Sequence, residues 1–296
     1  MLKTRLEGAV ALQFHMPSPA LAPYISTYYL TEVNQDAGES VEDWLHPEWA
    51  NLRFTQDQCW SSALGDAPLQ KLPQAIFTGP SCLPGHFVIE GRARIWGIGI
   101  LPLGWSRLIN GPASDLVDQT IDAHSSPHCA HLAGITDRVF GDARNPAEEA
   151  QRIDAFLLDL LAGRAPSEEE ARIHAAHTAL ISDEVNSVAE LAERLGISAR
   201  SLERLSLRAF GFSPKLLLRR QRFLRSLAQF MLDPSLSWIK TLDLHYVDQA
   251  HFVRDFKRFM AMSPSHYAAL DHPVLRAAAQ ARAATAGAAV QALHRP

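Results

Sequence analysis

The sequence predicts an α+β protein in which a β-rich N-terminal domain precedes an all-α C-terminal domain with two helix-turn-helix units. Three observations lead to this prediction. Short apolar runs bounded by Gly and Pro dominate residues 1–125, apolar residues at helical spacing dominate from residue 146, and basic residues concentrate in the second half of the chain. Bounded apolar runs are typical of strands, whereas a 3.6-residue period is typical of helices.

The composition is that of an ordinary globular protein. The chain has 296 residues, of which 47% are hydrophobic and 20% charged, and this length is enough for two domains. The first ten residues lack the apolar centre of a secretory signal, and no apolar run is long enough to span a bilayer. Three scattered cysteines, Cys59, Cys82 and Cys129, favour reduced thiols and a cytoplasmic location over a disulfide framework.

The net charge of −4 conceals an uneven distribution of charge along the chain. Residues 181–270 carry 13 Lys and Arg against 9 Asp and Glu, whereas residues 1–180 carry 12 against 22. The stretch 194–225 is the most basic, with nine cations and one acid, Glu203. A basic module on an acidic body is typical of proteins that bind nucleic acids, although a solvated helix face would carry the same charges.

Five short apolar-aromatic runs are the expected strands of the N-terminal half: 24–33, 51–54, 74–78, 86–90 and 94–101. Gly and Pro separate these runs, as they do between strands. We expect a helix at 104–110, irregular structure at 125–145, and mainly helices from Pro146 to Leu270.

The first helix-turn-helix unit is predicted at residues 187–211. Ser187 and Glu190 form a capping box, Gly196 supplies the left-handed turn, and Ser198 caps a second helix that ends at Gly211. In such units the outer face of the second helix enters the major groove, where Arg suits guanine and Glu suits cytosine. The residues expected on that face are Arg200, Ser201, Glu203, Arg204 and Arg208. An ordinary helical hairpin is the alternative interpretation.

A long helix from Pro214 to Leu232 leads to the second unit. This unit is predicted to contain a short helix at 237–244 and a helix at 249–260 that is capped by Asp248. The residues expected on the DNA face of the latter helix are Gln249, His251, Arg254, Lys257 and Arg258. Gln suits adenine, whereas a structural role for His251 is the alternative to a base or phosphate contact.

The order of motifs in this region resembles that of the AraC/XylS family of transcription regulators. The motifs are Phe210-Gly211-Phe212-Ser213-Pro214, Asp248-Gln249-Ala250-His251-Phe252 and Met262-Ser263-Pro264. The chain departs from the family where Ser206 replaces the usual Phe and where His245 and Ala261 replace the usual Gly. Lys240 and Thr241 also occupy places that are normally apolar and small. The resemblance implies sequence-specific binding to two successive major grooves.

The N-terminal half resembles a domain found in a subset of these regulators. The similar segments are 46–54, 78–80 and 97–105. The resemblance implies a cupin-like effector or dimerisation domain. Seven aromatic residues could line an apolar pocket, although plain core is the alternative role for them: Trp44, Trp49, Phe54, Trp60, Phe77, Trp96 and Trp105. The three assigned to the ligand site are Trp44, Trp49 and Trp96. His46 and Arg53, with Glu48 between them, are the nearby polar residues that would orient a ligand.

No catalytic residue, metal site or cofactor is expected. His124, His128, Cys129 and His131 match no standard zinc spacing. The sequence contains no nucleophile elbow, phosphate loop or H-E-x-x-H motif. A repair methyltransferase with a DNA-binding appendage is the rival from the enzyme class, and it would need an activated thiolate at Cys59 or Cys82.

The expected organisation is a β-rich effector or dimerisation domain at 1–145, a helical linker at 146–180, a DNA-binding domain at 181–270 and an Ala-rich tail at 271–296. The expected function is transcription regulation controlled by a small molecule. The expected partners are double-stranded DNA, a small-molecule effector, a second copy of the chain in a homodimer and, for an activator, RNA polymerase; no membrane partner is expected. A ligand-independent dimeric regulator is the alternative.

Overall fold

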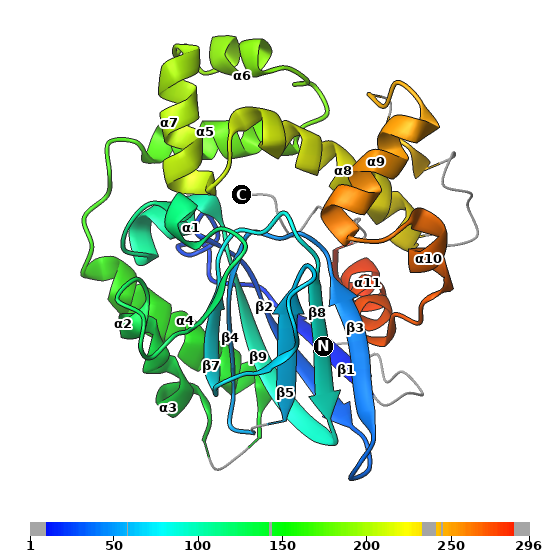
Figure 1. Ribbon diagram of the computed structural model, residues 1–296. Coiled ribbons are helices and arrows are strands. Elements are labelled where there is room, and N and C mark those ends of the chain that lie inside the picture. Colours follow the sequence, from blue (N-terminus) through cyan, green and yellow to red (C-terminus); the bar gives the residue numbers. More distant parts are fainter. Residues whose placement is uncertain (1–9, 58, 142–143, 233–240, 244, 287–296) are drawn as a thin grey trace.

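The computed structural model describes residues 10–57, 59–141, 144–232, 241–243 and 245–286 (Figure 1). A β-rich region with four helices at its side precedes a helical region, so the predicted fold class is confirmed. No helix in these ranges is both long and apolar enough to cross a membrane.

The larger of two antiparallel sheets has six strands in the order β1-β2-β9-β4-β7-β10. Along this order the strands are β1 (Val10–His15), β2 (Ile25–Asn34), β9 (Arg92–Ile100), β4 (Ala50–Thr55), β7 (Ala75–Thr78) and β10 (Thr120–Asp122). β9 lies between β2 and β4, and every residue after Arg92 is buried. A central strand that is covered on both faces explains the nearly continuous apolar run in its sequence.

The smaller sheet packs against one face of the larger one. Its strands, in the order β3-β8-β5-β6, are β3 (Ser40–Leu45), β8 (Gly85–Glu90), β5 (Trp60–Leu64) and β6 (Gln70–Lys71). The apolar side chains between the sheets include Ile95 of β9 and Ile89 of β8. The two sheets therefore form a sandwich with an interior of its own.

Helices cover the other face of the larger sheet. They are α1 (Pro102–Leu108), α2 (Ala130–Ala133), α3 (Ile135–Val139) and α4 (Pro146–Ala162). Ile153 and Phe156 of α4 pack with Trp96 and Ile98 of β9 in one buried cluster. The expectation of irregular structure at 125–145 was wrong, because α2 and α3 contribute Leu132, Ile135 and Val139 to this cluster. The short helix η1 (Ala113–Leu116) lies between α1 and β10 in the chain.

The helical region contains both helices of the first predicted helix-turn-helix unit and the second helix of the other unit. Its helices are α5 (Glu170–Ile181), α6 (Val188–Arg194), α7 (Ala199–Phe210), α8 (Pro214–Leu232), α9 (Gln249–Met260) and α10 (Pro264–Ala269). The side chains of Ser187, Ser198 and Asp248 cap α6, α7 and α9 as predicted. The helix expected at 237–244 falls almost wholly outside the described residues.

Two departures from the family pattern have visible structural roles. Ala261 ends α9 with a positive φ of 55°, the left-handed conformation for which Gly is the usual residue. This conformation costs a residue with a Cβ roughly 1–2 kcal/mol. Ser206 is buried at 2% exposure, so a small polar side chain occupies a core position of α7.

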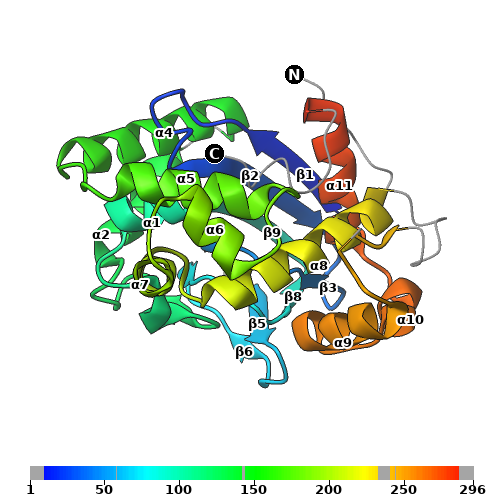
Figure 2. The ribbon, with the colours of Figure 1, turned by 90° about the horizontal axis from the view of Figure 1, so that it is seen from above.

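The Ala-rich tail forms a helix, α11 (Pro273–Ala286), that lies beside β1 and β3 (Figures 1 and 2). Val274, Ala277 and Ala278 are buried in the same cluster as Val10 and Leu12 of β1. The sequence predicts only an Ala-rich tail at 271–296, with no partner for it in the fold. In the structure it returns to the N-terminal sandwich and closes its open side.

Candidate functional site

A cavity of about 160 Å³ lies between the two sheets. Strands of both sheets supply most of its wall. Leu224 of α8 and three residues of α11, Val274, Leu275 and Ala278, complete the wall. A molecule in this cavity would therefore touch both the β-rich region and the helical region of the chain.

Two glycines of β9 leave space for polar side chains on the cavity side. Trp96 and Ile98 face the helices, so Gly97 and Gly99 face the opposite way. A Cβ at residue 97 would lie 2.0 Å from a ring carbon of Tyr29, and one at residue 99 would lie 2.2 Å from Ser26 Oγ. The Gly-Ile-Gly spacing thus permits the close packing that places Tyr29 at the cavity.

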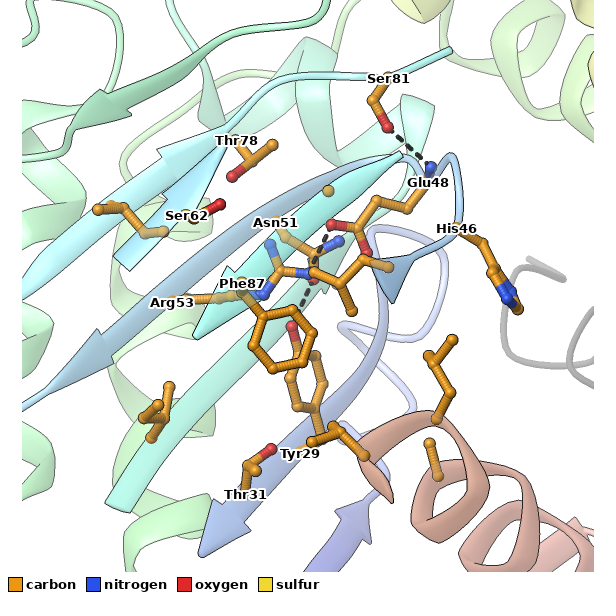
Figure 3. A pocket seen from close by; sticks show the side chains of 18 of the residues that line it. Tyr29, Thr31, His46, Glu48, Asn51, Arg53, Ser62, Thr78, Ser81 and Phe87 are labelled. Carbon is orange, nitrogen blue, oxygen red and sulfur yellow. Dashed lines mark hydrogen bonds and ion pairs between the residues drawn. The ribbon is translucent and has the colours of Figure 1, made fainter. Parts of the chain in front are cut away.

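A hydrogen-bonded polar cluster lies on the cavity wall (Figure 3). The Arg53 guanidinium donates to the Glu48 carboxylate at 2.5 Å, and the Tyr29 hydroxyl donates to Asn51 Oδ1 at 3.1 Å. Burial acts to lower the pKa of Arg53, but the interactions with Glu48 and Tyr29 together outweigh burial and raise that pKa. Arg53 therefore stays charged and paired in a largely apolar cavity.

The structure places His46 and Arg53 on the cavity wall, but not the three tryptophans that were predicted to accompany them. His46 Nε2 also lies 2.7 Å from the hydroxyl oxygen of Tyr267 on α10, so this histidine joins the cavity to the helical region.

The three tryptophans lie away from the cavity wall. Trp44 stacks on the ring of His86 at 4.2 Å between centroids. Trp49 is buried in the cluster of the helical region. Trp96 faces α4, where its indole N–H donates to the Glu149 carboxylate at 2.7 Å. Trp60 is the tryptophan that lines the cavity.

The residues of the wall that were not predicted from the sequence include two polar ones, Tyr29 and Asn51, and three apolar ones of α11, Val274, Leu275 and Ala278. The Ala-rich tail has apolar residues at helical spacing, which was the available signal for an amphipathic helix. No feature of the tail indicated that the helix would pack on β1.

Asp43 at the end of β3 holds the start of α11. Its carboxylate accepts hydrogen bonds from the backbone N–H groups of Val274 (2.9 Å) and Leu275 (2.8 Å) and from His272 Nδ1 (2.9 Å). His272 Nε2 lies 2.9 Å from the carbonyl oxygen of Tyr267. The Asp43 side chain is fully buried, and an anion at a helix N-terminus is a favourable arrangement.

Arg220 of α8 is a second link between the two regions. Its side chain is fully buried, and its guanidinium lies 3.9 Å from the ring centroid of Trp49. Arg220 donates to the carbonyl oxygens of Ser81 (2.9 Å) and Glu48 (3.4 Å). Because Ser81 and Glu48 both line the cavity, Arg220 connects the cavity wall to the long helix between the two units.

The predicted outer face of α7 is accessible in the structure. Arg200, Glu203, Arg204 and Arg208 are exposed, and Ser201 is half-buried where its N–H bonds the Ser198 cap. Arg208 also forms an ion pair with Glu169, just before α5. Leu202 and Leu205 on the inner face are buried, as a helix-turn-helix core requires.

The predicted face of α9 is accessible too. Gln249, Arg254, Lys257 and Arg258 are exposed, whereas His251 is half-buried. The His251 ring packs edge-on against Tyr246 at 5.1 Å, and its Nε2 lies 3.8 Å from Asp255 Oδ2. These contacts favour the structural role that the sequence left open for this histidine.

Burial raises the pKa of the Asp118 carboxyl group, and the positive charges of Arg220 and Arg258 oppose that rise.

A cleft between the two units carries further positive charge. Its lining residues are Asn186, Ser187, Val188, Lys215, Leu218, Arg219, Arg222, His251 and Arg254. Arg219 is paired with the buried Asp255, and Lys215 is exposed. The long helix α8 thus presents cations between the two outer faces, where a polyanion would meet them.

The residues considered for metal or thiol chemistry lie in other arrangements. His128 Nδ1 is 2.6 Å from the Asn110 carbonyl oxygen, and His131 Nε2 is 2.7 Å from that of Leu108. Within the described ranges there is no group of three or more side chains suited to hold a metal ion.

Burial raises the pKa values of the free thiols of Cys59, Cys82 and Cys129 to about 11. At neutral pH the thiol form therefore dominates at all three positions, and the thiolate is the nucleophilic form.

Two family descriptions match the chain. Residues 191–269 match a helix-turn-helix domain, and residues 13–122 match a domain of unknown function (DUF6597). No curated protein matches the sequence.

Several solved structures are similar to this chain. ToxT from Vibrio cholerae is 10% identical over 87% of this chain and 98% of its own, with a TM-score of 0.45. Unsaturated fatty acid bound wild-type ToxT from strain SCE256 is 9% identical over 81% of this chain and 94% of its own, with a TM-score of 0.43. A cupin superfamily protein from Desulfitobacterium hafniense DCB-2 is 16% identical over 33% of this chain and 83% of its own, with a TM-score of 0.25.

Proposed function

We propose that the chain is a transcription regulator that binds double-stranded DNA at specific sequences, because residues 191–269 match a helix-turn-helix domain. The observation that carries this proposal is the pair of accessible polar faces on α7 and α9, joined by α8. Arg200, Ser201, Glu203, Arg204 and Arg208 would contact one groove. Gln249, Arg254, Lys257 and Arg258 would contact the next, and His251 would support that face through its contacts with Tyr246 and Asp255.

Selection of bound duplexes from a random library, followed by footprinting, tests this function. Arg204→Ala and Arg254→Ala should each weaken specific binding by about 1–3 kcal/mol and relax the preference at one base pair. The two affected positions should lie about one helical turn apart. Arg92→Ala, at an exposed position of β9, is the control and should leave binding unchanged. A footprint confined to one groove would contradict the two-unit proposal.

The cavity is the proposed effector site. This proposal is supported by its composite wall, since Leu224 and α11 close a space that the sheets alone leave open. A ligand acts on a protein only through its different affinities for two states. A molecule that touches α8 and α11 is in a position to favour one arrangement of the helical region over another.

We further propose a division into an effector region at 1–145, a linker at 146–180 and a DNA-binding region at 181–270, with the tail serving the effector region. Reduced thiols in a DNA-binding protein suit a cytoplasmic location. RNA polymerase would be a partner of an activator, and a second copy of the chain would provide a second DNA-binding domain. Sedimentation of the chain with and without its DNA site tests for the dimer.

A ligand-independent dimeric regulator remains the second candidate, and it requires that no small molecule alters DNA affinity. The enzyme alternative has less support. A repair methyltransferase needs a reactive thiolate, and burial raises the pKa values of Cys59 and Cys82 to about 11.

A further inference from the structure

We propose that the cavity binds an uncharged, mainly apolar molecule of about one ring that carries a hydroxyl, carbonyl or amide group, and that it excludes the corresponding acid and amine. This inference rests on the cavity being a ligand site, as proposed above, and it specifies the chemical class of the ligand.

The balance of charge in the cavity is the first argument. Among the described lining residues, Arg53 and Glu48 are the only Arg, Lys, Asp or Glu side chains. They are 10% and 17% exposed and pair at 2.5 Å, so each neutralises the other. A ligand with a further charge would leave one buried charge without a partner, which is costly in an apolar environment.

The attachment of the pair to the fold is the second argument. Arg53 stands on β4, which is hydrogen-bonded to β7 on one side and β9 on the other. The Glu48 N–H donates to Ser81 Oγ at 3.0 Å, and its carbonyl oxygen accepts from the Ser81 N–H at 3.0 Å. The backbone is therefore fixed at both Arg53 and Glu48. A charged ligand would have to break the ion pair between these residues, because the pair cannot move aside as a unit.

The remaining wall suits a neutral polar group. Thr31, Ser62 and Thr78 contribute hydroxyls, and Asn51 contributes an amide (Figure 3). Hydroxyl and amide groups can both donate and accept hydrogen bonds, so they match an alcohol, a carbonyl or an amide without any change of charge. Phe87 is among the apolar side chains that complete the wall.

The size of the cavity limits the ligand. Its volume of about 160 Å³ is close to that of an apolar cavity of about 150 Å³ that holds benzene. A ligand with one ring and a short polar substituent fits such a space.

Three matched probes test the inference on the full chain at pH 7: benzyl alcohol, benzoate and benzylamine, each titrated by calorimetry. Benzyl alcohol should bind at least about tenfold more tightly than either ion, a ratio equal to about 1.4 kcal/mol. The inference is overturned if either ion binds as tightly as the alcohol, or if none of the three binds.

Two variants should reverse the preference in opposite directions. Glu48→Gln leaves Arg53 without its counter-ion, so the ratio of benzoate to benzyl alcohol affinity should rise at least about tenfold. Arg53→Gln leaves Glu48 alone, so benzylamine should gain in the same way. Glu42→Gln is the control, since Glu42 pairs with His86 at 2.6 Å and does not line the cavity.

Thermal melting identifies any variant that fails to fold. In that case the order of the three probe affinities on the wild-type chain alone tests the preference of the cavity for a neutral ligand. The test separates this inference from the proposed function. If benzoate binds best and changes DNA affinity, the effector site stands and the charge argument fails. If benzyl alcohol binds best and DNA affinity does not change, the charge argument stands and the effector role fails.

Discussion

Arg220 shows how one buried cation can join two parts of a chain. It leaves α8, lies against Trp49 and donates to the carbonyl oxygen of Ser81. Burial lowers the pKa of Arg220, although the neighbouring Cys82 and Asp118 act in the opposite direction. Removing the Arg220 guanidinium from water is therefore unfavourable. Its hydrogen bond to the Ser81 carbonyl and its contact with the Trp49 ring offset that loss of solvation.

Replacement of Arg220 by Met keeps most of the side-chain length and removes the donors. The Ser81 carbonyl then loses a partner in a buried site, so the free energy of unfolding should fall by about 1–3 kcal/mol in urea denaturation. Lys215→Met, at an exposed position of the same helix, should change it by no more than about 0.5 kcal/mol. Equal effects of the two variants would argue against the buried link.

The contact between His272 and Asp43 should make the attachment of α11 depend on pH. Burial acts to lower the pKa of His272, but hydrogen bonds to Asp43 and to the Tyr267 carbonyl outweigh it and raise that pKa above its ordinary value of 6.5. Arg276 is the other charged group that acts on this ring, and it opposes the rise. A group with a raised folded pKa stabilises the fold at low pH and loses that contribution as the pH rises through the raised pKa.

His272→Gln should therefore lower the free energy of unfolding by about 1–3 kcal/mol at pH 6, and by less at pH 8. Urea denaturation of both proteins at the two pH values measures the difference. The difference in free energy of unfolding between the wild type and His272→Gln should shrink toward pH 8. A difference that stays constant or grows would mean that the charged form of His272 is not the stabilising one.

Single residues also show where the sequence was insufficient. It offered a ligand pocket or plain core as the role of Trp49 and Trp96, and both side chains are buried in the structure. Which face of the sheet Trp96 would occupy was not readable, since adjacent residues of a strand point to opposite faces. In the structure Trp96 faces α4 and Gly97 faces the cavity, so the glycine rather than the tryptophan shapes the site.

Among the elements, those with local signals could be predicted and those defined by distant contacts could not. The caps at Ser187, Ser198 and Asp248 act within three residues of themselves, and all three form as predicted. The packing of α11 has no such local signal. An Ala-rich helix can form from its own sequence, but the strand on which it packs lies more than two hundred residues away in the chain. The packing of α11 on β1 therefore appears only in the folded chain.

Removal of α11 should affect the sandwich more than the DNA-binding helices. A chain that ends at Leu270 loses the buried Val274 and opens the cavity. Since burial of a Val side chain contributes about 1.5–3 kcal/mol, the free energy of unfolding should fall by at least that amount.

DNA affinity without a ligand should persist in this truncated chain, whereas binding of a cavity probe should be lost. Calorimetry and DNA titration measure the two properties separately. A chain that ends at residue 286 keeps α11 and serves as the control. Undiminished probe binding by the shorter chain would remove α11 from the site.

In the whole molecule, the two DNA-binding helices are not parallel. α7 stands upright in Figure 1 and is seen end-on in Figure 2, whereas α9 is tilted in the first view and lies lengthwise in the second. Successive major grooves on one face of a straight duplex present the same orientation to each unit. Joint binding therefore requires the two units to turn relative to each other or the duplex to bend.

This geometry gives the effector a defined way to act. A ligand that favours one relative placement of the units should change DNA affinity, and DNA should change ligand affinity by the same factor. The factor is expected to lie between about 5 and 150, the usual range of such coupling. The factor is measured once by titrating the effector with and without DNA, and once by titrating DNA with and without the effector. Unequal values would show that the two sites are not linked through one equilibrium.

The position of α11 also fixes when the cavity becomes complete during synthesis of the protein. A ribosome makes the strands of the sandwich first, and residues 274–278 emerge only after α7 and α9 have been made. A nascent chain that already contains every strand still has an open cavity. An effector that needs the complete cavity would therefore be retained only by chains in which the proposed DNA-binding helices already exist, so incomplete products of translation would not compete for it.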